Sequence, residues 1–330
     1  MRPHPKPDFT HPFCVQTEIN RIVAHQKKRG IPKPTDKNLV IATWNITNFG
    51  LQEREDNHIK LMAKIIEPFD IVAVQEVADN LDHMIKLLEY LGEDWDTKFT
   101  DIGGNSERLG YLFKKSRVDI TELAAELAMR GYERKRITIT VGDESGAEHE
   151  EPFQGFNRNP YMIGFKKDKF EFTLVNVHLY WSNFIWRRLE ATALAKWAKN
   201  RVKKSHPPNN DIILIGDFNM YRVEEGDKIY DDVVKNGGLQ FPKYETELVG
   251  TNLAGDGHYD ELAFFPSRTV EDFSGRIGVF DFDKALFAEL WPDDLKPPTE
   301  KKEMKEKFFK YIRYYLADHR VLWAEFLTKN

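Results

Sequence analysis

The chain has 330 residues, 41% of them hydrophobic, and its 23 Phe and 7 Trp allow it to bury a large core. Its formal net charge of -5, from 48 basic and 53 acidic residues, gives no overall attraction to nucleic acid or anionic membranes, so any site for a polyanion must be local. The single cysteine, Cys14, excludes an internal disulfide framework and a metal site built from cysteines.

The N-terminal residues differ in composition from the rest of the chain. Residues 1–12 are rich in Pro and His and predict a loose arm. Residues 15–29 predict a helix that ends at Gly30, since Pro32 and Pro34 prevent its continuation. No apolar run reaches the roughly 20 residues of a membrane span, and none near the start is long enough for a signal peptide. We therefore expect a cytoplasmic protein, although a trimmed secreted form would have the same sequence.

After this region, strands and helices alternate without a clear linker. Apolar runs predict buried strands at 39–45, 70–77, 109–114, 161–166, 170–179, 212–216 and 260–265. Apolar residues at helical spacing predict helices at 57–67, from 81 to about 91, at 184–203 and at 299–315. The polar segment 142–155, interrupted by glycines, predicts a loop or the tip of a hairpin.

Four of the predicted strands end in the same way, with a polar side chain after an apolar run. The residues are Asn45, Glu76, His178, and Asp217 with Asn219. Strand ends in a layered α/β protein collect at one rim, where functional sites are usually built. Asp217 and Asn219 share a face if the strand continues that far. Each residue alone also fits a turn, a surface acid or a core histidine, but together they predict a site.

Three further candidates come late in the chain. Asp260 stands at the start of a predicted strand, and Asp318 and His319 come immediately before another. The candidates are thus carboxylates, histidines and asparagine amides, with no nucleophilic serine or cysteine motif. This set suits Mg²⁺, which takes oxygen ligands from carboxylates, water and phosphate. The histidines then stay available for acid–base chemistry or charge stabilisation.

Eight segments resemble, in order, the motifs of the endonuclease/exonuclease/phosphatase superfamily, which has the DNase I-like fold. They are TWN (43–45), QE (75–76), ERLGYLF (107–113), RNP (158–160), NVHL (176–179), GDFN (216–219), YDE (259–261) and DHR (318–320). The resemblance covers about residues 38–328 and is nearest to bacterial-type DNase I-like nucleases. It implies an α/β fold of four layers, two packed β-sheets flanked by helices. We expect one catalytic domain at 38–330, with an arm and a helix at 1–37 outside the resemblance.

The resemblance also implies a metal site and a water-activating group. Glu76 corresponds to the principal metal ligand, with Asn45 beside it and Asp318 contributing. Asp217 corresponds to the residue that orients or deprotonates the attacking water, and Asn219 to one that helps hold the scissile phosphate. We expect Mg²⁺ as the cofactor, with Mn²⁺ as a substitute.

The remaining implied roles concern the phosphate. His319 matches a residue that contacts a non-bridging oxygen, and Asp260 matches the carboxylate that orients it. His178 would stabilise the same phosphate from another side. Tyr111 and Arg158 match positions that contact the phosphate or the nucleic-acid backbone, so they are candidate substrate-binding residues.

The resulting hypothesis is a metal-dependent phosphodiesterase acting on nucleic acid, first of all a monomeric DNA endonuclease that uses activated water. Basic clusters at 130–136 and 196–204 would grip the phosphate backbone or be solvated surface. Aromatic residues at 180–186 would stack on bases or, as is more usual, pack into the core. The alternatives are a phosphomonoesterase or a phospholipid phosphodiesterase of the same superfamily and, last, an inactive binding module, which is disfavoured because the motif residues are all present.

Overall fold

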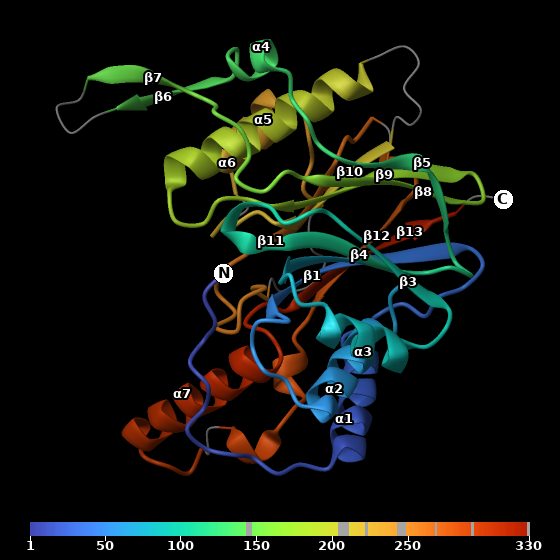
Figure 1. Ribbon diagram of the computed structural model, residues 1–330, viewed down its shortest axis with the longest axis vertical. Coiled ribbons are helices and arrows are strands. Elements are labelled where there is room, and N and C mark those ends of the chain that lie inside the picture. The colour runs from blue at the N-terminus through green and yellow to red at the C-terminus, as the bar shows by residue number, and fades with distance from the viewer. Residues whose placement is uncertain are drawn as a thin grey trace.

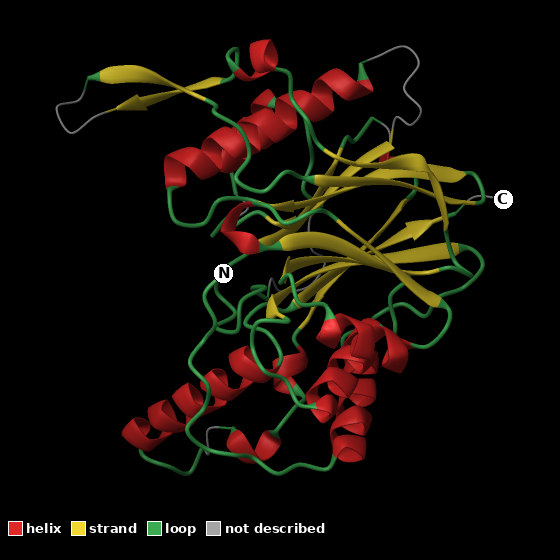
Figure 2. Cartoon of the chain, in the orientation of Figure 1, coloured by secondary structure: helices red, strands yellow, loops and turns green. Residues whose placement is uncertain are grey.

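Two β-sheets pack face to face in the middle of the molecule, and helices cover their outer faces (Figures 1 and 2). The computed structural model describes residues 1–142, 147–203, 211–221, 224–242, 249–267, 269–291 and 294–328. This arrangement confirms the expected four-layer α/β sandwich.

The first sheet has six strands in the order β12-β13-β1-β2-β4-β3. β1 is parallel to β2 and antiparallel to β13. The bounds are β1 Asn38–Phe49, β2 Ile71–Val77, β3 Trp95–Phe99, β4 Arg108–Lys114, β12 Phe273–Phe280 and β13 Val321–Leu327.

The second sheet has five strands in the order β11-β10-β9-β8-β5. β9 and β10 are parallel, and β11 pairs with β10 antiparallel. The bounds are β5 Asp119–Glu126, β8 Tyr161–Lys167, β9 Phe170–His178, β10 Asp211–Asp217 and β11 Asp260–Phe264.

Helices cover the outer face of each sheet (Figure 1). The first sheet carries α1 Val15–Lys28, α2 Asp56–Ile66, α3 Asp82–Leu91 and α7 Pro298–Tyr315. The second carries α5 Phe184–Val202 and the short α6 Lys228–Asp231, and α4 Gly131–Arg134 lies beyond them. In the described ranges, no helix has both the length and the apolar character needed to cross a membrane.

The apolar strand runs are buried on both faces because each sheet lies between another sheet and a helical layer. In β1, Leu39 and Ile41 enter the core between the sheets, while Val40, Ala42 and Trp44 enter the core beneath the helices. This alternation is the period-2 geometry of a strand. It explains why these strands read as continuous apolar runs.

Every predicted helix and strand is present. The polar segment also forms the predicted hairpin, from β6 Thr138–Gly142 and β7 Glu148–Pro152, and residues 143–146 of its tip lie outside the described residues. The sequence does not predict β3, β5 or β12. Their segments WDTKF, DITELAAE and FSGRIGVF interrupt apolar residues with charged residues or glycine, since parts of these strands face solvent.

The N-terminal residues 1–13, here called the strap, contradict the expectation of a loose arm. The strap runs from the rim of the sheets past α7 to the start of α1 (Figure 1). Pro7 is buried, and the ring of Phe9 stacks on Tyr311 of α7 at 5.9 Å between centroids. Phe13 meets Phe287 edge to face at 5.0 Å. Aromatic contacts therefore hold the strap against the domain.

Candidate active site

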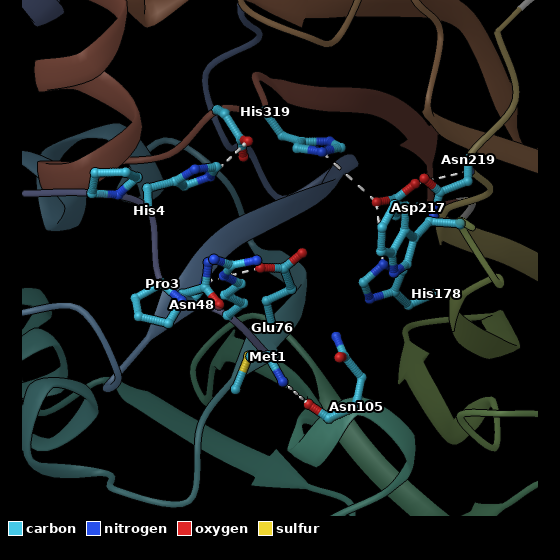
Figure 3. A pocket seen from close by; sticks show the side chains of 14 residues that line it. Met1, Pro3, His4, Asn48, Glu76, Asn105, His178, Asp217, Asn219 and His319 are labelled. Atoms are coloured by element: carbon cyan, nitrogen blue, oxygen red, sulfur yellow. Dashed lines mark hydrogen bonds and ion pairs between the residues drawn. The ribbon is translucent and has the colours of Figure 1, made fainter.

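The polar strand ends meet in one pocket of about 810 Å³ at the rim of the two sheets (Figure 3). Both sheets and the strap contribute to its walls. The pocket contains six residues predicted from the sequence and eight others: Glu76, His178, Asp217, Asn219, Asp318 and His319, with Met1, Arg2, Pro3, His4, Pro5, Asn48, Asn105 and Trp181.

The end of β10 places Asp217 at the centre of this pocket. Gly216 has φ +138°, and a Cβ there would lie 2.1 Å from the carbonyl oxygen of Val177, so only glycine allows β10 to approach β9 this closely. Asp217 consequently lies opposite His178 in the strand register. Phe218 is fully buried, and Asn219 turns back so that its backbone nitrogen donates to Asp217 Oδ1 at 2.8 Å.

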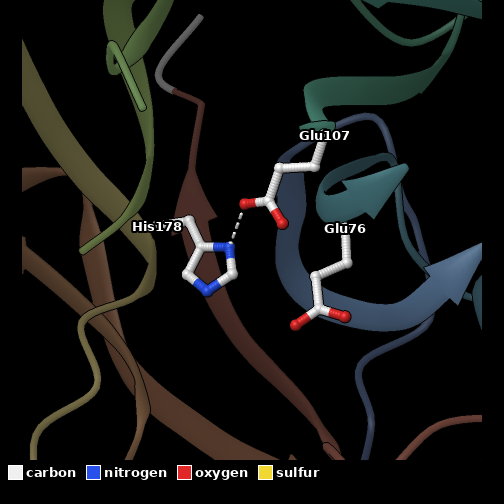
Figure 4. Close-up of side chains that lie close together, drawn as sticks. All are labelled: Glu76, Glu107 and His178. Atoms are coloured by element: carbon white, nitrogen blue, oxygen red, sulfur yellow. Dashed lines mark ion pairs between the residues drawn. The ribbon is translucent and has the colours of Figure 1, made fainter. Parts of the chain in front are cut away.

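The two histidines of the site are each backed by a carboxylate. His319 Nδ1 lies 2.7 Å from Asp260 Oδ2, and His178 Nδ1 lies 2.6 Å from Glu107 Oε1 (Figure 4). Their Nε2 atoms face the same oxygen, Asp217 Oδ2, at 3.8 Å for His319 and 3.5 Å for His178. The backing carboxylates fix the orientation of the rings. The arrangement therefore directs two imidazoles toward one central carboxylate.

These carboxylates decide the protonation of the imidazoles. Burial acts to lower the pKa of His319, but the charges of Asp260 and Asp217 outweigh it and raise the pKa well above its usual value. For His178, burial and the charge of Arg158 act downward, and Glu107 and Asp217 again raise the pKa overall. The neighbouring carboxylates therefore favour the protonated form of both imidazoles.

Glu76 is the penultimate residue of β2 and has a strained backbone conformation. Its φ of +60° costs a non-glycine residue about 1–3 kcal/mol, and such strain is common at functional sites. Asn45 Nδ2 donates to Glu76 Oε1 at 3.0 Å and to Asp217 Oδ2 at 3.1 Å. Burial raises the pKa of Glu76, and the negative charges of Glu107 and Asp318 add to this rise. The carboxylates are thus crowded in a way that a cation would relieve.

Asp318 is held in place from two sides. Thr47 Oγ1 donates to Asp318 Oδ1 at 2.6 Å, and His4 Nε2 lies 3.1 Å from Asp318 Oδ2. Burial acts to raise the pKa of Asp318, but these hydrogen bonds and the charge of His319 lower it below its usual range. Asp318 therefore stays ionised in the pocket that also contains Glu76.

The donor set fits a hard divalent cation. Glu76 and Asp318 present carboxylate oxygens to the pocket, the ligand type that Mg²⁺ prefers. The structure directs the amide nitrogen of Asn45 at Glu76, while its Oδ1 accepts a hydrogen bond from the backbone of Thr47 at 3.1 Å. Two sets of possible ligand atoms, each within 4.8 Å of one another, occur in the described residues: Glu76, Glu107 and His178, and Asp217, Asp260 and His319.

Tyr111 and Arg158 do not lie where the resemblance implied. The hydroxyl of Tyr111 is buried between the sheets and donates to the carbonyl oxygens of Tyr161 at 3.0 Å and Leu174 at 2.9 Å. Arg158 is 3% exposed and donates to the carbonyl oxygen of His178 at 2.9 Å. Neither side chain lines the pocket, so the expectation that they contact the phosphate is corrected: they hold other parts of the site in place.

Glu107 is a site residue that the sequence did not single out. It lies in the quoted ERLGYLF segment, but its partners His178 and Arg158 come from distant segments. Arg158 Nε lies 3.0 Å from Glu107 Oε1. Burial acts to raise the pKa of Glu107, but the charges of His178 and Arg158 lower it overall. Glu107, Arg158 and His178 come together only when the two sheets pack against each other.

A polar bridge joins the sheets beneath the pocket. The side-chain amide of Asn176 donates to the carbonyl oxygens of Val74 at 3.0 Å and Gly110 at 2.8 Å. Gln75 Nε2 in turn donates to Asn176 Oδ1 at 2.6 Å. Since these groups are fully buried, their hydrogen bonds fix how one sheet sits on the other.

The aromatic residues after β9 are more exposed than their usual packing role predicts. Trp181 is 63% exposed and lines the pocket, and Phe184 and Trp186 are 43% and 53% exposed. The basic clusters instead meet at another hollow of about 770 Å³, where Arg130, Arg136, Lys196 and Arg201 stand together; Lys204 lies outside the described residues. Neither predicted basic cluster therefore lines the pocket at the rim of the sheets, whose wall includes Trp181.

Comparison with known proteins identifies the class of this fold and site. Residues 42–232 match the endonuclease/exonuclease/phosphatase family, so the chain belongs to this family of metal-dependent phosphoesterases. No curated protein matches the sequence.

Solved structures share the fold at low sequence identity. A family member from Bacteroides thetaiotaomicron is 17% identical, with a TM-score of 0.55 over 88% of this chain and 95% of the other. A mannosyl-6-phosphatase from Bacteroides thetaiotaomicron VPI-5482 is 16% identical, with a TM-score of 0.53 over 88% and 100%. A humanized TDP2 from D. rerio is 14% identical, with a TM-score of 0.53 over 89% and 100%.

Proposed function

We propose that this protein is a divalent-metal-dependent phosphodiesterase that hydrolyses nucleic acid by in-line attack of water, with DNA as its first candidate substrate. The observation that carries this proposal is the convergence of two carboxylate-backed imidazoles on Asp217. The carboxylate of Asp217 can hold the attacking water, and the imidazoles on either side of it can donate hydrogen bonds to the phosphate that this water attacks. The exposed Trp181 at the wall offers a face on which a base or sugar can stack.

Each side chain then has a distinct task. Asp217 Oδ2 orients the attacking water and accepts its proton. The protonated Nε2 atoms of His178 and His319 donate to phosphate oxygens as negative charge develops on them. Asn219 Nδ2 uses one hydrogen on the carbonyl oxygen of Leu179, at 2.8 Å, and its second hydrogen stays available for the phosphate.

Glu76 and Asp318 are the proposed ligands of the cation, with Asn45 beside them. When bound, Mg²⁺ or Mn²⁺ would polarise a phosphoryl oxygen and offset its charge. Asn45 connects the metal side with the water side of the site, since its amide nitrogen bonds to both Glu76 and Asp217. Thr47 keeps Asp318 directed into the pocket.

A phosphomonoesterase is the second candidate, and the shape of the pocket favours it. A volume of about 810 Å³ lies within the usual range for small-molecule sites, and the strap closes part of the opening. One of the proteins with the same fold is a mannosyl-6-phosphatase. A sugar phosphate would fit between the strap and Trp181.

The first experiment incubates the purified protein with supercoiled plasmid, and separately with p-nitrophenyl phosphate and bis(p-nitrophenyl) phosphate. Each substrate is tested with Mg²⁺, with Mn²⁺ and with chelator, and His178→Ala controls for contaminating enzymes. Metal-dependent nicking that the variant lacks supports the DNA nuclease, and release from the monoester alone supports the phosphatase. Glu76→Ala should raise the metal concentration needed for half-maximal activity. An unchanged requirement contradicts the ligand assignment.

A further inference from the structure

The strap crosses the catalytic pocket. The main-chain nitrogen of Met1 contacts the carbonyl oxygen of Asn105 on one side, and on the other His4 and Pro5 line a second hollow together with Phe309 and Arg313 of α7. Between these points the strap lies beside Glu76, which Figure 3 shows near Pro3, and His4 Nε2 lies 3.1 Å from Asp318 Oδ2. The strap is therefore a wall of the metal side of the site.

A buried side chain anchors this crossing. Gln52 is 1% exposed, and its Oε1 accepts a hydrogen bond from the backbone nitrogen of His4 at 2.7 Å. Its Nε2 donates to the carbonyl oxygens of Tyr314, at 2.9 Å, and Arg313 at the end of α7. The side-chain oxygen and nitrogen of Gln52 thus join the strap to α7, and these hydrogen bonds fix the position of His4.

The rest of the strap is held by weaker contacts. Lys6 pairs with Glu53 at 2.8 Å, and Asp8 pairs with Lys310 at 2.9 Å. These pairs are exposed and, as is typical of surface ion pairs, stabilise the docked strap little. The ring of Phe9 stacks on Tyr311 of α7, which is a modest additional contact. A few substitutions away from the pocket can therefore loosen the strap.

The crossing limits which phosphates can enter. A phosphate inside a duplex is joined to further nucleotides on both sides, and the complementary strand lies beside it. Specific contacts with a duplex typically bury about 1,000–2,500 Å² of protein surface. Here the strap occupies the metal side of the opening and Trp181 stands in the wall. A phosphate at the end of a chain, or on a small molecule, carries a substituent on one side at most. It can therefore enter the pocket without meeting the strap.

We infer that the strap selects substrates by size: docked across the pocket, it favours a phosphate on a small molecule or at a chain end and slows the hydrolysis of a phosphate inside duplex DNA. This inference rests on the proposed phosphoester hydrolysis. It also explains how one catalytic centre could discriminate between the two candidate substrate classes. The residues responsible are Pro3 and His4, and the anchors that hold them are Gln52 and the contacts of Lys6 and Phe9.

The test compares two diesters that differ in size, supercoiled plasmid and bis(p-nitrophenyl) phosphate, in the full-length protein. The first variant, Lys6→Ala/Phe9→Ala, weakens the docked strap without touching the pocket. The second, Pro3→Gly/His4→Gly, removes the side chains of the wall directly. Lys302→Ala is the matched control: Lys302 also lies on α7, but its side chain pairs with Glu306 rather than with the strap. Limited proteolysis within residues 1–13 reports whether the strap is released.

We expect the ratio of the plasmid rate to the small-diester rate to rise at least tenfold in both strap variants, with no change in the control. A ratio that stays within twofold of the parent protein in both variants overturns the inference. If no ester is hydrolysed by any form, the proposed function fails instead. Fluorescence anisotropy with a labelled 20-base-pair duplex then decides the inference: tighter binding by both strap variants supports it, and equal binding overturns it.

Discussion

Replacing Gly216 by alanine should separate Asp217 from His178 with little change elsewhere. The added Cβ would lie 2.1 Å from the carbonyl oxygen of Val177 and 2.8 Å from its nitrogen. Real Cβ atoms essentially never come closer than 3.0 Å to such atoms, so the two strands must separate locally by about 0.9 Å. The residues that follow on each strand are Asp217 and His178, which are partners in the register.

The substitution should lower both the stability of the fold and the turnover. The φ of +138° and the steric overlap together should lower the free energy of unfolding by about 2–5 kcal/mol, of which backbone strain accounts for about 1–2 kcal/mol. The separation of Asp217 from His178 should lower turnover about 100-fold, because a misplacement near 1 Å has an effect of that order. The loss of activity should therefore exceed the loss that unfolding alone explains.

Urea unfolding and initial rates on bis(p-nitrophenyl) phosphate measure the two effects separately. Gly238→Ala is the matched control: Gly238 has φ +80°, but no atom lies within 4 Å of an added Cβ. It should show the strain, about 1–2 kcal/mol, with full activity. Full activity in Gly216→Ala would refute the argument that close strand approach sets the geometry of the site.

Three further predictions concern charge. Asp217→Asn should lower turnover by about 10²–10⁴-fold while the thermal unfolding midpoint stays within a few degrees, and retained turnover would exclude its role toward water. Glu107→Gln should lower the pKa of His178, measured by NMR titration, because the carboxylate that raises it is gone; an unmoved pKa would contradict the pairing. Burial acts to raise the pKa of Asp281, but hydrogen bonds from His25 of α1 and from Arg29, which follows that helix, lower it to about 2. Its ionised form should therefore contribute about 2 kcal/mol of stability above pH 4 that disappears as the pH falls toward 2, and Asp281→Asn should lower the unfolding free energy at pH 7 but not at pH 2.

The sequence predicted the parts of the site that depend on strand ends. Asn45, Glu76, His178 and Asp217 follow apolar runs, and the packing of those runs in two sheets leaves little choice about where the next residue lies. The sequence left open whether Asn219 continues the strand or belongs to a turn; β10 ends at Asp217, and Asn219 lies in the turn with φ +51°.

The errors concern side-chain direction and long-range pairing. Tyr111 lies on a predicted strand, but a strand alternates between two faces, and the sequence did not show that this residue faces the other sheet. Arg158 reaches backbone oxygens that only the neighbouring β9 supplies. The strap lacks periodicity, and its docking depends on Gln52 and on the aromatic surface of α7, so composition alone suggested a loose segment.

The position of β13 has a consequence for how the molecule folds. Thr43 of β1 pairs with Leu322 of β13, and β13 separates β12 from β1 in the first sheet. Contacts between residues so far apart in the sequence form slowly, because a long loop must close first. During synthesis the first sheet stays divided until β13 has emerged, and Asp318 and His319 precede that strand directly. The nascent chain should therefore remain without hydrolytic activity until its last strand is in place.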